Sequence, residues 1–164
     1  MNIRIRKASS ADQAFLREML YRSLYVPEGH EPFSRDIVKL PEIAKYVADW
    51  GKSGDVALIA NDLENGLSVG AVWLRLLTAL QKGYGYVDDK TPEVGIAVLP
   101  DYRRRGVGTM LLEQLFRDAE STYQAVSLSV SRNNPAINLY KKLGFESVNE
   151  DDNSVVMLKI FSPA

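Results

Sequence analysis

The chain has 164 residues, 46% of them hydrophobic, which is enough for one domain to bury a core without disulfides. The absence of cysteine excludes disulfides, thiolate metal sites and a cysteine nucleophile, and a single histidine excludes a His-rich metal site. Twenty basic and 21 acidic residues give a net charge of -1, so the sequence predicts no general attraction to nucleic acid or membranes. We expect a soluble cytoplasmic protein.

Hydrophobic periodicity and turn residues divide the first half of the chain. Ser10 and Gln13 have the spacing of a capping box, which predicts that a helix begins there, and Pro41 divides a later helical region. In chain order, this half predicts a strand at 3–6, a helix at about 11–22, helical structure around 43–50 and a hairpin of 56–60 with 69–74.

The second half of the chain predicts two more strand-and-helix pairs, followed by two strands. Asn134 and Gly144 are suited to the two ends of one of its helices. In chain order, this half predicts a mobile loop at 78–91, a strand at 94–98, a helix at 106–120, a strand at 126–130, a helix at 135–143 and strands at 145–148 and 154–160. The order describes an α/β or α+β domain around one sheet.

A basic turn that contains two glycines follows the strand at 94–98. It begins at Arg103, and the glycines are Gly106 and Gly108, where the next helix starts. Amides at a helix start carry partial positive charge, and glycine lets an anion approach them closely. The turn therefore predicts a diphosphate site. It lacks the Lys-Ser/Thr ending of a Walker A loop and the third glycine of a dinucleotide site.

A second motif lies about thirty residues further on, with Asn133, Ala136 and Tyr140 at positions i, i+3 and i+7, and it ends in Gly144-Phe145. Ala136 and Tyr140 share one helical face, with Asn133 just ahead of it. The small alanine leaves room for a ligand between two polar side chains.

Together the two motifs resemble those of the GCN5-related N-acetyltransferase (GNAT) family. The resemblance implies an α/β (α+β) fold with a mixed, mostly antiparallel sheet of about seven strands flanked by four helices, in a single domain over residues 1–164. It also implies an acetyl-CoA-dependent N-acetyltransferase, which transfers the acetyl group directly to a primary amine in a ternary complex.

The resemblance also assigns residues to coenzyme A binding. Amides of the arginine turn would hold the diphosphate, the backbone of the 94–98 strand would bond the pantetheine arm, and the second motif would contact the pantetheine and the sulfur. The residues so assigned are Ile96, Ala97, Val98, Arg103, Arg104, Arg105, Gly106, Val107, Gly108, Thr109, Asn133, Ala136 and Tyr140. No metal is expected.

Two residues are the candidates for catalysis. Tyr140 is the general acid, because a tyrosine with a pKa of about 10 stays protonated and can donate to a departing thiolate. Glu93 is the candidate base that deprotonates the amine; the alternatives are a solvated carboxylate at the strand end with no such role, and an ordered water as the base. The Val98 amide would stabilise the oxyanion if the strand splays from its neighbour.

The acceptor is expected to be a small primary amine. The alternatives are a protein N-terminus or lysine, a noncatalytic module that binds acyl-CoA, and a nucleotide-binding module. The family places the acceptor pocket at about 21–50 and 78–91, where the available specificity residues are Tyr25, His30, Phe33, Tyr46, Trp73, Arg75, Tyr84 and Tyr86. The sequence leaves open the acceptor, the acyl group and the oligomeric state, although dimers are frequent in the family.

Overall fold

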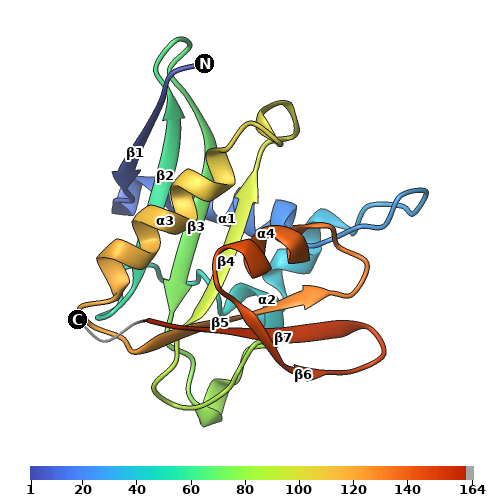
Figure 1. The fold of residues 1–164 in the computed structure, drawn as a ribbon. Helices are drawn as coiled ribbons and strands as arrows, with labels where there is room; N and C mark the ends of the chain where they lie inside the picture. The colour runs from blue at the N-terminus through green and yellow to red at the C-terminus, as the bar shows by residue number, and fades with distance from the viewer. Residues whose placement is uncertain (162–164) are drawn as a thin grey trace.

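A computed structural model describes residues 1–161, which form one seven-stranded sheet between two layers of helices (Figure 1). The sheet order is β1-β2-β3-β4-β5-β7-β6, and every neighbouring pair is antiparallel except β4 and β5. The strands are β1 (Ile3–Lys7), β2 (Val56–Asp62), β3 (Leu67–Arg75), β4 (Glu93–Val98), β5 (Ala125–Ser131), β6 (Glu146–Glu150) and β7 (Ser154–Ile160). The fold class predicted from the sequence is confirmed.

The helices cover both faces of the sheet, with α3 in front of it and α1 behind it in Figure 1. They are α1 (Gln13–Ser23), α2 (Pro41–Ala44), α3 (Val107–Ala119) and α4 (Ala136–Lys142). One core packs α3 and α4 against the sheet, and a second core packs α1 and α2 against the opposite face of β2, β3 and β4. Alternating residues of the central strands supply both cores, as the pleat requires.

The capping box before α1 lies one residue earlier than predicted. The capping box is formed by Ser9 and Asp12 around a short 3-10 turn, and Ser10 with Gln13 does not form it. Arg6 binds the Asp12 carboxylate through two N–O contacts of 2.8 Å, which lowers the pKa of Asp12 to about 2. Gln13 instead bonds the backbone of the segment after α2.

The second helical region is shorter than its hydrophobic spacing suggested. A 3-10 helix at Arg35–Lys39 precedes α2, and Pro41 opens α2, because proline fits the first turn of a helix. Ile43 and Val47 are buried on a shared face as predicted, but the backbone continues in turns after Ala44. The segment after Ala44 is held in place by long-range hydrogen bonds.

Strands β4 and β5 diverge soon after they meet. Their only paired position is Glu93 with Ser127, at the start of β4. On its other side β4 stays paired with β3 along its whole length, up to Val98 with Gly70. One edge of β4 is therefore open toward the site.

Candidate active site

The arginine turn adopts a backbone suited to binding an anion. Arg104 and Gly106 have positive φ values of 61° and 84°, and α3 begins directly after them with no side chain capping its first amides. The first bond within the helix joins the Met110 N–H to the Gly106 carbonyl. The amides of the preceding helical residues, 107–109, therefore have no partner within the helix.

Tyr102 fixes the turn to the β2–β3 hairpin. Its hydroxyl donates to Asp62 Oδ2 at 2.7 Å and accepts from Asn65 Nδ2 at 2.9 Å. The hydrogen bond to the Asp62 carboxylate raises the pKa of Tyr102. The Arg105 guanidinium lies 5.6 Å from the centre of the Tyr102 ring, and Arg103 Nε donates to the Val98 carbonyl at 3.0 Å. The turn is thus held in place from both sides.

The open edge of β4 presents backbone groups to the space left by β5. Leu99 donates to the Val69 carbonyl, so the alternation of an antiparallel pair turns the amides of Ile96 and Val98 away from β3. The backbone of Ala97, by contrast, pairs with Ala71. The amides of Ile96 and Val98 therefore face the β5 side, where they can donate to an extended ligand, whereas the Val98 carbonyl accepts from Arg103. This divergence of β4 from β5 is the splay on which the oxyanion hypothesis depends.

A groove of about 850 Å³ follows this open edge and the arginine turn. It brings together most of the residues predicted to bind coenzyme A, although Arg105, Val107 and Asn133 do not line it. Asn134 does line it, and its side chain also accepts from the Ala136 N–H at the start of α4. The predicted residues that line the groove are Ile96, Ala97, Val98, Arg103, Arg104, Gly106, Gly108, Thr109, Ala136 and Tyr140.

Tyr140 lies where the groove meets a second, smaller space, which we call the inner cavity. Its side chain lines both, although the residue is only 8% exposed. Packing against Phe145, at 5.9 Å between ring centres, orients the ring. Burial raises the pKa of Tyr140 to about 12, so the hydroxyl keeps its proton at neutral pH.

The inner cavity has a volume of about 230 Å³ and lies between the α1–α2 layer and the diverging strands. Glu93 lines it from the start of β4 and is only 2% exposed. The alternative of a solvated strand-end carboxylate is wrong, because the loop before β4 folds back over the side chain. Burial raises the pKa of Glu93 above its ordinary value.

Neutral donors hold the Glu93 carboxylate. The amides of Gly83 and Gly85 donate to Oε2 at 3.0 Å and to Oε1 at 2.8 Å, and the Tyr46 hydroxyl donates to Oε1 at 3.3 Å. A Cβ on Gly83 would lie 2.3 Å from the carboxylate oxygens, so only glycine allows this approach. Ser127 closes the arrangement by donating to the Gly85 carbonyl at 2.7 Å.

Tyr46 joins the segment after α2, the 78–91 loop and Glu93. Its hydroxyl accepts from the Tyr84 N–H at 2.6 Å while donating to Glu93. Burial and the neighbouring carboxylate raise its pKa, so it stays a neutral donor. The loop expected at 78–91 thus lies against the carboxylate through three backbone amides, two direct and one through Tyr46.

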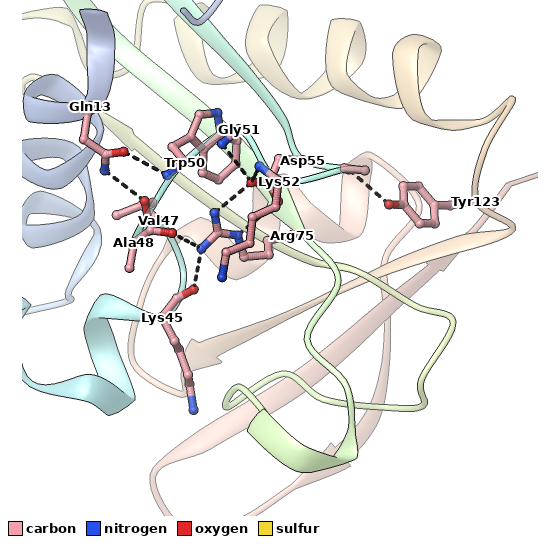
Figure 2. A network of polar contacts seen from close by, with 11 residues as sticks. Gln13, Lys45, Val47, Ala48, Trp50, Gly51, Lys52, Asp55, Arg75 and Tyr123 are labelled. Carbon is pink, nitrogen blue, oxygen red and sulfur yellow. Dashed lines mark hydrogen bonds and ion pairs between the residues drawn. The ribbon is translucent and has the colours of Figure 1, made fainter. Parts of the chain in front are cut away.

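The network in Figure 2 holds the segment that carries Tyr46. Arg75 forms two bonds to the Asp55 carboxylate, at 3.0 and 2.7 Å, and two more to the carbonyls of Lys45 and Ala48, at 2.9 and 2.6 Å. The guanidinium also lies 4.9 Å from the ring centre of Trp50. Because these contacts use the whole guanidinium fork, Arg75 is a support for this segment, and its prediction as a specificity residue is wrong.

The other candidates for acceptor recognition divide between the two spaces. Tyr25, Tyr46, Trp73 and Tyr84 line the inner cavity, and Phe33 lines the groove. Neither His30 nor Tyr86 lines either space. The sequence did not single out Ser127, because its role depends on a partner 42 residues away.

Two further properties concern the whole of the described chain. Within residues 1–161 no group of three or more His, Asp or Glu side chains is arranged to hold a metal ion. No helix in that range has the length and hydropathy to cross a membrane.

Comparison with known proteins identifies similar sequences and folds. The model of the protein family described as "Acetyltransferase (GNAT) family" matches residues 15–145. An N-alpha-acetyltransferase of Saccharolobus solfataricus is 30% identical over 112 residues, which are 63% of this chain and 62% of that protein. One from Sulfurisphaera tokodaii is 53% identical over 58 residues, 34% of this chain and 35% of that protein. The chain thus spans less than two thirds of either relative.

A solved structure with the same fold is the PaiA N-acetyltransferase of Thermoplasma acidophilum, determined in complex with coenzyme A. It covers 98% of this chain and 100% of its own, with a TM-score of 0.64 and 22% identity.

Proposed function

The chain belongs to the acetyltransferase (GNAT) family, and we propose that it transfers the acetyl group of acetyl-CoA directly to a primary amine. The observation that carries this proposal is that the groove and the inner cavity meet at Tyr140 and Ile96. The groove suits an anionic acetyl carrier, and the inner cavity holds the buried carboxylate of Glu93. Two reactants ordered side by side react without a covalent enzyme intermediate.

The groove fits acetyl-CoA. Free amides at the start of α3, beside Arg103 and Arg104, suit a diphosphate, and the open edge of β4 suits the amide-rich pantetheine arm. A Cβ on Gly108 would meet only Leu139 and Ile96, at ordinary distances of 3.7 and 3.8 Å, so packing alone does not require glycine there. When bound, acetyl-CoA supplies the acetyl group as a thioester.

Glu93 and Tyr140 exchange protons with the reactants in this proposal. Glu93 takes a proton from the acceptor ammonium, directly or through a water, which frees the nitrogen to form the new C–N bond. Tyr140 gives its proton to the sulfur as the C–S bond breaks, and the second proton that the nitrogen loses on becoming an amide restores the Tyr140 hydroxyl through water. The Val98 amide, turned away from β3, stabilises the negative charge on the carbonyl oxygen between these steps.

The acceptor that we propose is a small primary amine. A cavity of 230 Å³ has about the volume of eight waters in the liquid, so it admits a group about the size of one amino-acid side chain. A second candidate is the α-amine of a protein N-terminus, favoured by the names of the relatives from Saccharolobus and Sulfurisphaera. In that case only the first residue would enter the inner cavity.

Thiol release from acetyl-CoA tests the activity against a panel of amines and peptides. Tyr140→Phe should lower kcat by about 10²-fold, the low end for general acid catalysis. Tyr123→Phe is the matched control, because Tyr123 lines neither space. Binding of acetyl-CoA with no turnover on any amine, peptide or protein extract would favour the noncatalytic module instead.

Titration calorimetry with coenzyme A tests the groove. Gly108→Glu should reduce affinity by at least about 10²-fold, because it places a negative charge against the diphosphate. Gly108→Ala, which adds bulk without charge, should reduce the affinity for coenzyme A less. Unchanged affinity in folded Gly108→Glu would remove the diphosphate from this turn, and stronger binding of ATP than of coenzyme A would favour a nucleotide module.

A further inference from the structure

The inner cavity carries a negative charge and no positive one. Among the described residues that line it, Glu93 is the only one that is charged. The rest of the wall is aromatic, aliphatic, or neutral and polar, with tyrosines, the Trp73 indole and several serine hydroxyls. An ammonium group therefore finds a partner in this cavity, whereas a carboxylate finds only repulsion and neutral donors.

Positive charge is concentrated in the groove instead. All the lysines and arginines that line either space lie there, and two of them belong to the turn proposed for the diphosphate. They are Arg22, Arg103, Arg104 and Lys142. The two spaces are thus segregated by charge, although they share Tyr140 at their junction.

The nearby cations outside the cavity wall are already engaged. Lys45 donates to the Lys82 carbonyl and lies 5.9 Å from the ring centre of Tyr84, at the rim. Arg75 is the cross-strand neighbour of Glu93, but Asp55 and two carbonyls occupy its guanidinium. The guanidinium of Arg75 is therefore not free to neutralise an anion in the cavity. The ammonium of Lys45 lowers the pKa of Glu93 from outside the wall and does not line the cavity itself.

One neutral donor in the cavity wall lacks a partner. Trp73 Nε1 is the only buried side-chain nitrogen or oxygen among residues 1–161 that makes no hydrogen bond. The indole lies over Gly95, where a Cβ would come within 2.4 Å of Nε1. A carboxylate that lost its water in this cavity would need a cation, and a neutral N–H does not supply one.

We infer that the acceptor has no anionic group next to its reactive amine. The site accepts simple alkyl or arylalkyl amines and α-amines whose carboxyl group is blocked as an amide, as in a peptide, and it rejects free α-amino acids. This inference rests on the proposed acetyl transfer and narrows its substrate class.

Matched acceptors test the inference in the unmodified protein. Thiol release is measured for the free acid, the amide and the decarboxylated amine of glycine, alanine, leucine and phenylalanine, with kcat/KM expressed per unprotonated amine. The amides and the decarboxylated amines should exceed the free acids by about 100-fold or more, because like charges a few ångströms apart repel strongly in a partly buried site. Free acids that react as well as their amides would overturn the inference while leaving acetyl transfer intact. No turnover with any of these acceptors, with peptides or with a protein extract would overturn the proposed function.

A variant that adds a cation to the wall of the inner cavity tests whether charge causes the preference for amides over free acids. Ser129 lies on β5 and lines the inner cavity, so Ser129→Arg places a guanidinium there. The preference for amide over free acid should fall by at least about tenfold. Ser147→Arg, on the exposed edge strand β6, is the control. An unchanged preference in a Ser129→Arg protein that still acetylates the amides would contradict the charge explanation.

Discussion

Asp55 and Glu93 are both buried carboxylates beside the end of the β3–β4 pair, and their partners differ. Asp55 faces the Arg75 guanidinium, and the exposed fractions of the two side chains are 3% and 5%. Glu93 has only neutral donors, two amides and a tyrosine hydroxyl. A charge neutralised by a cation supports the fold, whereas a buried charge without one is kept available for chemistry.

The register of the sheet places Arg75 next to Glu93, although Arg75 pairs with Asp55. Arg75 is the residue directly opposite Glu93, and cross-strand partners project to the same face. Asp55 nevertheless holds the guanidinium, which is turned toward the carbonyls after α2 (Figure 2). The arginine that would lower the pKa of Glu93 is thereby occupied elsewhere.

The largest expected effect is the loss of the proton acceptor. Glu93→Gln should lower kcat/KM by about 10²- to 10⁴-fold, the range of general base catalysis, and leave coenzyme A affinity unchanged. Glu113→Gln, at an exposed position of α3, is the control in the same thiol-release assay. A Glu93→Gln protein as active as the control would remove Glu93 from catalysis.

Loss of the Asp55 carboxylate should mainly lower the stability of the fold. Asp55→Asn leaves the buried Arg75 without its counter-ion, so the free energy of unfolding should fall by about 3–5 kcal/mol. Urea denaturation measures this loss. Asp36→Asn removes an exposed pair with Lys39 and should change little. An Asp55→Asn protein as stable as the wild type would show that the pair is not a support.

Tyr46→Phe should have a smaller effect, on the pH dependence of the reaction. The hydroxyl bond to Glu93 stabilises the charged form and lowers the pKa of Glu93, so its removal should raise that pKa further. The acidic limb of the kcat profile should then move to higher pH, and kcat at neutral pH should fall by about 2- to 10-fold, as for one hydrogen bond. A shift to lower pH would contradict the proposed contact.

Local patterns in the sequence are sufficient to predict the helices and strands and most of the residues that line the groove. Strand alternation, the glycines of the arginine turn and the i, i+3, i+7 motif predict elements and an anion site, because each depends on residues close together in the chain. The capping box was placed one residue late, since serines stand at both positions 9 and 10 and the sequence does not show which side chain faces the amides.

The inner cavity depends on contacts that the sequence does not display. Glu93 meets Tyr46 across 47 residues, and Arg75 meets Asp55 across 20. Hydrophobic periodicity and composition give no sign of such pairs, so the sequence lists Arg75 among the available specificity residues and does not show its structural role. The glycines of the 83–85 loop suggested mobility, whereas their missing Cβ atoms allow the loop to close on a carboxylate.

The central claim is that Glu93 is a buried carboxylate, hydrogen-bonded only by neutral donors, that accepts the substrate proton. Carbon-13 NMR titration of its carboxyl group, assigned with Glu93→Gln, measures this directly. We predict a pKa above the ordinary value of 4.5, matching an acidic limb of kcat that does not move when the pKa of the acceptor amine is varied. A carboxyl group that titrates at or below 4.5, or a limb that persists in Glu93→Gln, would contradict the account.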